Sequence, residues 1–178
     1  MAWLWIAMIA LVTLFNVAER RRGGLPAFRV HGPDTLQVAI WCLLGLMDPD
    51  TSLVLENVSG HGFLQFVLIA QEDLARTVEF TVPAVEWSQP FFLAMQQALE
   101  AAAFRPAIQH DSKRRWGAPV LRLRLEGSPG ALAQQMEWIV FQAVRTLGWE
   151  GPQFTARFFG KFAPGGEQRW REATRPAK

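Results

Sequence analysis

The 178-residue chain contains no tyrosine and a single cysteine, Cys42, and these absences limit the chemistry it can carry. One cysteine can form neither an intramolecular disulfide nor a thiolate metal cluster, which is typical of a protein in a reducing compartment. Because Cys42 lies inside an apolar run, we expect a small buried side chain at this position and not a nucleophile.

Histidine is also scarce, and the three present are far apart in the sequence. His31, His61 and His110 match neither an HExxH nor a His-x-His spacing, so the sequence indicates no metal site. A P-loop, a dinucleotide-binding glycine pattern and a GxSxG nucleophile motif are absent as well. We therefore expect no enzyme activity, no cofactor and no small-molecule substrate.

Net positive charge is confined to the two flanks of the chain, and the whole chain carries only +2. The stretch between the flanks is net acidic. The linker is basic through Arg20, Arg21, Arg22 and Arg29, and the tail is mildly basic through Arg169, Arg171, Arg175 and Lys178. A nucleic-acid binder would carry its positive charge on the domain together with a reading motif, so we expect no nucleic-acid partner. The basic flank fits anionic lipid headgroups better.

One long stretch lacks charge altogether. Between Ala2 and Ala18 the only polar residues are Thr13 and Asn16. As a helix, about 17 residues reach about 25 Å, enough for a thin hydrocarbon core of about 30 Å. A cleavable signal peptide is the alternative, but no basic residue precedes the run and no small-x-small site follows it. Residues 1–19 are thus predicted to be a transmembrane anchor.

The residues on either side of this stretch predict its orientation. Lys and Arg favour the cytoplasmic side, so Arg20, Arg21 and Arg22 place the following domain in the cytoplasm and the N-terminus outside. Trp3 and Trp5 would then lie at the outer interface of a bacterial inner membrane. Residues 20–33, opened by this basic cluster, read as a juxtamembrane linker.

Aromatic residues are abundant, and their excess allows two interpretations. The chain has 13 Phe and 8 Trp, and most of them follow the predicted anchor. They fit a domain covered by lipid or partner subunits, or simply a core rich in phenylalanine.

The pattern of residues 34–162 predicts one α+β domain, in which helices back an antiparallel sheet. The predicted order of its elements is α-β-β-β-α-β-β-α. The expected elements are a helix over 36–47, strands over 51–58, 63–70 and 76–82, a helix over 88–104, a hairpin of 107–111 and 120–126, and a helix over 131–147. The first helix is either a core helix or one lying on the membrane surface. The run 63–70 is apolar throughout, which is typical of a strand buried on both faces. Residues 154–162 fit an edge strand or an aromatic strap, and 163–178 a polar, basic, extended tail.

This order resembles the type III secretion chaperone-like superfamily of small α+β peptide-binding domains. The resemblance is carried by the meander from Phe63 to Val82, the helix from Phe91 to Phe104 and the closing helix from Ala131 to Leu147. It implies a sheet backed by helices that binds a partner polypeptide without catalysis. Members of that superfamily are usually acidic, soluble dimers, whereas this chain is slightly basic and carries a predicted anchor.

The predicted hairpin carries the most concentrated basic patch outside the linker. Three interpretations remain open: a solvated turn, a contact with lipid headgroups, or a docking surface for an acidic protein partner. Arg and Trp often contribute much of the binding energy at protein interfaces, so the docking surface remains one of the alternatives. The candidate docking residues are Lys113, Arg114, Arg115, Trp116, Arg122 and Arg124.

Two functions follow from these features. The first is a non-catalytic accessory or assembly subunit of a bacterial inner-membrane complex, with other membrane-protein subunits as partners and a respiratory or photosynthetic, energy-transducing complex as one candidate. The second is a membrane-tethered peptide-binding chaperone.

Overall fold

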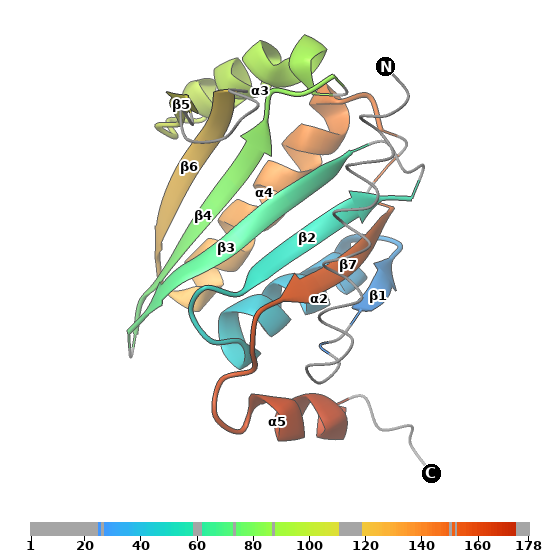
Figure 1. The fold of residues 1–178 in the computed structure, drawn as a ribbon, viewed down its shortest axis with the longest axis vertical. Helices are drawn as coiled ribbons and strands as arrows, with labels where there is room; N and C mark the ends of the chain where they lie inside the picture. The colour runs from blue at the N-terminus through green and yellow to red at the C-terminus, as the bar shows by residue number, and fades with distance from the viewer. Residues whose placement is uncertain are drawn as a thin grey trace.

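The computed structural model describes Leu25 and residues 27–58, 62–72, 74–86, 88–110, 119–149, 151 and 153–173. Over these residues the chain forms an α+β fold with a seven-stranded antiparallel sheet of order β1-β7-β2-β3-β4-β6-β5 (Figure 1). The predicted α+β class and antiparallel sheet are therefore confirmed, whereas the predicted transmembrane helix is not among the described helices. The elements are β1 (Ala27–Val30), α2 (Pro33–Leu46), β2 (Ser52–Asn57), β3 (Phe63–Gln71), β4 (Arg76–Pro83), α3 (Gln89–Ala101), β5 (Ala107–His110), β6 (Pro119–Gly127), α4 (Pro129–Thr146), β7 (Phe154–Phe159) and α5 (Gly166–Ala173).

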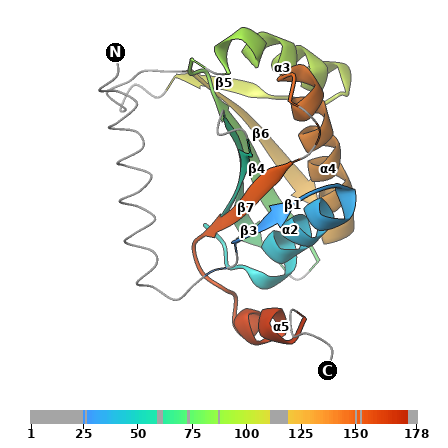
Figure 2. The same ribbon diagram turned by 90° about the vertical axis from the view of Figure 1, so that its right-hand side faces the viewer.

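Helices α2, α3 and α4 cover one face of the sheet, and no described helix covers the other face (Figure 2). Strand residues alternate between the two faces, so β6 buries Leu121, Leu123 and Leu125 while Arg124 and Glu126 remain exposed. The core lies between the helices and this inner face. The opposite face, which we call the open face, carries polar side chains such as Glu79 and Arg124 together with apolar ones such as Val67.

Helix α4 follows the signals in its sequence closely. The Ser128 hydroxyl accepts a hydrogen bond from the Ala131 amide at 3.3 Å, and Pro129 occupies the first turn, where its missing N–H costs nothing. Gly148 then ends the helical run with a φ of +66°. Apolar residues at helical spacing predict one buried stripe along this helix, and all of its members are buried, namely Leu132, Met136, Ile139, Val140, Ala143 and Leu147.

Helix α2 is a core helix, one of the two alternatives left open by its sequence. It buries Leu36, Ile40, Leu43 and Leu44 against the sheet and α4. Its apolar outer surface is not wholly covered, because Trp41 remains 46% exposed.

The open face corrects the prediction for β3. The continuous apolar run suggests burial on both faces, yet Leu64, Phe66 and Leu68 are buried while the alternate residues, such as Val67, are only partly covered. The expectation is wrong because helices lie on one face only in the described part of the chain, and local sequence does not report that.

Two further differences enlarge the domain beyond residues 34–162. The predicted linker contains β1, which pairs with β7, and β7 lies between β1 and β2 instead of at an edge. The predicted extended tail contains α5, whose Trp170 stacks on Phe28 of β1 with ring centroids 5.8 Å apart.

The spacing of Phe92, Met95, Leu99 and Ala102 predicts a buried stripe on α3. The first three are buried, whereas Ala102 is exposed where the helix ends.

Candidate docking surface on the β5–β6 edge

The residues of the predicted anchor and its interface lie outside the described part of the chain. This applies to Trp3, Trp5, Arg20, Arg21 and Arg22. Among the helices that the structure describes, none combines the length and the apolar character needed to cross a membrane. The anchor therefore stays a prediction from sequence.

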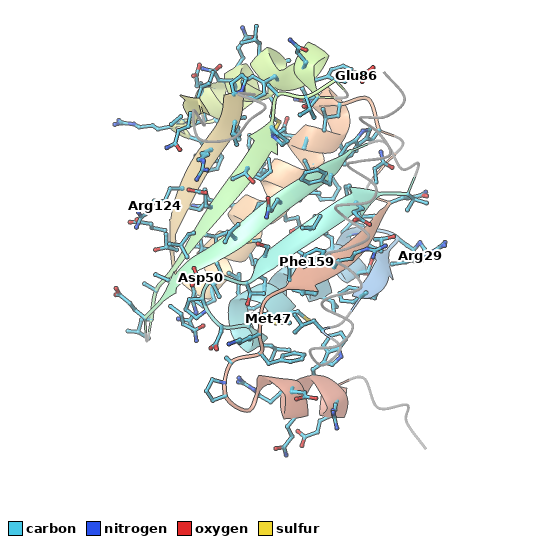
Figure 3. All side chains as sticks on the ribbon, in the orientation of Figure 1. Arg29, Met47, Asp50, Glu86, Arg124 and Phe159 are labelled. Carbon is cyan, nitrogen blue, oxygen red and sulfur yellow. The ribbon has the colours of Figure 1, made fainter. Side chains whose placement is uncertain are left out.

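The basic residues of the hairpin divide into two groups. Lys113, Arg114, Arg115 and Trp116 fall in the segment 111–118, which lies outside the described residues. Arg122 and Arg124 lie on the open face of β6, at the opposite side of the sheet from Arg29 on β1 (Figure 3).

Both strand arginines have acidic partners that the sequence prediction did not assign. The Arg122 guanidinium lies 2.9 Å from a Glu79 carboxylate oxygen on the neighbouring strand, with 36% of its side chain exposed. Arg124 pairs with Glu126 on its own strand at 2.7 Å. The Arg124–Glu126 pair is exposed, and exposed pairs contribute about 0–1 kcal/mol to stability. The Arg122–Glu79 pair is half-buried. The signal in the sequence was the alternation of charged and apolar residues in β6 and the outward position of Glu79 in β4.

Strand β5 supplies a feature that sequence reasoning missed. It forms one edge of the sheet, and its Ala107, Ile108 and Gln109 are all exposed. Its backbone pairs with β6 on one side, and no backbone hydrogen bond to another described element occupies its outer side. Arg105, just before the strand, is also exposed. An unpaired strand edge offers backbone N–H and C=O groups to a further strand. A cation beside it attracts a negatively charged one.

The centre of the open face is a hydrogen-bonded row of uncharged side chains. Thr81 donates to the Gln65 side-chain oxygen at 3.3 Å, and the Gln65 amide donates to Ser52 at 3.2 Å. On the β1 side of this row, Arg157 and Glu56 form an ion pair at 2.8 Å. These two hydrogen bonds and this ion pair link side chains of neighbouring strands across the open face.

Reactive chemistry has few candidates in the described ranges. No group of three or more His, Cys, Asp or Glu side chains there is placed to hold a metal ion. Cys42 is buried in α2, and burial raises the pKa of its thiol to about 12. At neutral pH this thiol stays protonated, so it behaves as an apolar side chain.

Comparison of this chain with family models, with curated proteins and with solved structures finds no match in any of the three.

Proposed function

We propose that this chain is a non-catalytic accessory or assembly subunit of a bacterial inner-membrane complex, held by one N-terminal helix with its α+β domain in the cytoplasm. The observation that carries the proposal is the charge-free run of residues 2–18, followed at once by Arg20, Arg21 and Arg22. A respiratory or photosynthetic, energy-transducing complex is one candidate for the assembly.

The distance between anchor and domain supports a role close to the membrane. Only residues 23–26 separate the basic cluster from the start of β1 at Ala27. Five extended steps of about 3.4 Å span at most about 17 Å. A domain joined this closely to the bilayer is suited to contact other membrane-protein subunits and the anionic headgroups around them.

The second candidate is a membrane-tethered chaperone that binds an extended client. The free edge of β5 favours it, because extended peptides bind to sheet edges through their backbone. The resemblance to type III secretion chaperones points the same way, although the sheet has two more strands, β1 and β7, than the order on which that resemblance rests.

Gentle detergent extraction followed by native separation and identification of co-migrating chains tests both candidates. A large complex of fixed stoichiometry is expected for an accessory subunit. Varied, substoichiometric unfolded clients would indicate the chaperone instead, and a clean monomer would contradict both.

The basic hairpin can be tested within the same experiment. Replacing Arg114, Arg115 and Trp116 together by alanine should reduce recovery of the partner chains if the hairpin docks on them. The matched control replaces the exposed Gln168, Arg169 and Arg171 by alanine on α5, which lies far from β5 (Figure 1). Equal recovery with both variants would remove the hairpin from the docking surface.

A further inference from the structure

We propose that the outer edge of β5 binds one extended segment of an acidic polypeptide, which joins the sheet as an additional strand. This inference rests on the proposed docking function and specifies how the partner is held. The site consists of the backbone of residues 107–110 and the neighbouring Arg105.

The two edges of the sheet differ in how far they are covered. At one edge, β1 has its Val30 fully buried and its Phe28 stacked on Trp170 of α5. At the other edge, three successive residues of β5 are exposed, and Ile108 shows 38% of its surface. No described element lies outside β5 (Figure 1). Although Ala27 and Arg29 of β1 are exposed as well, β5 is the less covered of the two edge strands.

Strand β5 also lacks most devices that keep sheet edges from pairing. Its sequence, Ala-Ile-Gln-His, contains no lysine and no proline, and its pairing with β6 runs without a bulge from Ala107 to His110. Within the described residues 107–110, the one protective device present is the shortness of the strand. An unprotected edge with regular pairing on its inner side is ready to accept a strand on its outer side.

Charge indicates what kind of strand would bind. Residues 105–124 contain six Lys and Arg and one Asp, a net charge of +5, whereas the whole chain carries only +2, so the remainder carries −3. Arg122 and Arg124 are already paired with Glu79 and Glu126. Arg105 has no ion-pair partner in the described part of the chain, so the edge retains uncompensated positive charge. An acidic partner meets this field favourably.

The position of β5 favours a polypeptide over a lipid surface. In the strand order, β5 lies six spacings from β1, or about 29 Å across the sheet at about 4.8 Å per spacing. The predicted anchor joins the domain at β1, so the anchored edge and the free edge are opposite edges. A lipid surface would be attracted by the positive charge but would form no backbone hydrogen bonds with β5. An added acidic strand would make both interactions.

The test uses the full chain in mild detergent and a fluorescent eight-residue peptide of alternating valine and glutamate. Two further peptides are N-methylated, one at every valine and the other at every glutamate. Alternate amides of a strand point to opposite edges, so each methylated peptide has one blocked edge. We expect the unmodified peptide to bind, at least a tenfold loss for one methylated peptide, and a change within about twofold for the other. Anisotropy measures the affinity, and hydrogen exchange should show protection of the β5 amides.

Two variants with the same change in charge provide the control. Arg105→Glu should weaken binding of the unmodified peptide at least threefold, whereas Arg169→Glu on α5 should leave it unchanged. Equal weakening by both would mean that net charge alone drives binding.

Several outcomes would overturn the inference. Equal affinity of the two methylated peptides would exclude strand addition. Absence of peptide binding, with binding to vesicles containing phosphatidylglycerol but not to phosphatidylcholine vesicles, would assign the edge to lipid. The native separation tests the proposed function independently: absence of co-migrating subunits there would contradict the accessory-subunit role, whatever the peptide assay shows.

Discussion

At the scale of single residues, the approach between Thr51 and Gly160 ties the start of β2 to the chain leaving β7. The buried Thr51 hydroxyl donates to the Lys161 carbonyl at 3.1 Å and accepts from the Lys161 amide at 3.2 Å. Gly160 has a φ of +148°, and a Cβ there would lie 2.7 Å from the Thr51 Cα. Only glycine fits this position without displacing backbone.

Replacing Gly160 by alanine should therefore lower the free energy of unfolding by about 2 kcal/mol or more, because both the steric clash and the φ angle oppose it. Gly45→Ala is the control, since nothing lies within 4 Å of a Cβ at Gly45 and alanine favours a helix interior by up to about 1 kcal/mol. Urea unfolding of the full chain in detergent measures both. Equal stability of the two variants would contradict the observed approach.

Cys42 provides a second prediction, for alkaline pH. Its pKa is raised by burial from 9.0 to about 12, so between these values the unfolded thiol loses its proton while the folded thiol keeps it. The contribution of Cys42 to stability is thus complete below pH 9 and declines as the pH rises toward 12. Between pH 9 and pH 12, the free energy of unfolding should fall more for the native chain than for Cys42→Ala.

Alkylation by iodoacetamide gives an independent measure of the same burial. Cys42 should resist the reagent at pH 8 in the folded chain and react in urea. Rapid modification of the folded chain would show that the thiol is accessible.

At the scale of elements, α5 depends on contacts made far away in the sequence. Trp170 stacks on Phe28, Arg169 donates to the Gly45 carbonyl at 3.3 Å, and the Ala163 amide donates to the Leu46 carbonyl at 2.8 Å. A helix of eight residues is marginal alone, so these contacts hold it in place.

Trp170→Ala should accordingly loosen α5 while the rest of the domain stays folded. We expect amide exchange across residues 166–173 to rise at least tenfold and exchange in α4 to stay unchanged. Gln168→Ala is the control on the same helix. It removes only an exposed side-chain hydrogen bond to Glu172, which contributes about a few tenths of a kcal/mol to stability. Unchanged exchange in α5 of Trp170→Ala would mean that other contacts hold this helix.

The same dependence explains which elements the sequence could predict. The alternation in β4 and β6 and the stripe of α4 are local patterns, and all three elements are found where expected. Strand β1 is four residues long, and the central place of β7 depends on its pairing with β1 and β2, more than 90 residues away. Pairing between strands so far apart cannot be predicted from the local sequence pattern.

The candidate site was predictable only in part for a similar reason. The basic character of the hairpin is visible in the sequence, and so is the outward direction of Arg122 and Arg124. Their partners, Glu79 and Glu126, and the exposure of the β5 edge depend on strand order.

At the scale of the whole molecule, β1 and β5 lie at opposite edges of the sheet. The anchor predicted from residues 2–18 would join the domain through β1, so the exposed β5 edge would lie across the sheet from it. An accessory subunit built in this way would have one edge held at the membrane and the other available to a partner.

The central claim is that residues 2–18 anchor this domain on the cytoplasmic side of the membrane, and cysteine labelling tests it most directly. In a Cys42→Ala chain, single cysteines replace Ala2 or Lys178, and right-side-out inner-membrane vesicles are treated with a membrane-impermeant maleimide. The account predicts that the chain resists alkaline carbonate extraction, that position 2 is labelled in intact vesicles and that position 178 is labelled only after lysis. Release of the full-length chain by carbonate, or labelling of position 178 in intact vesicles, would contradict it.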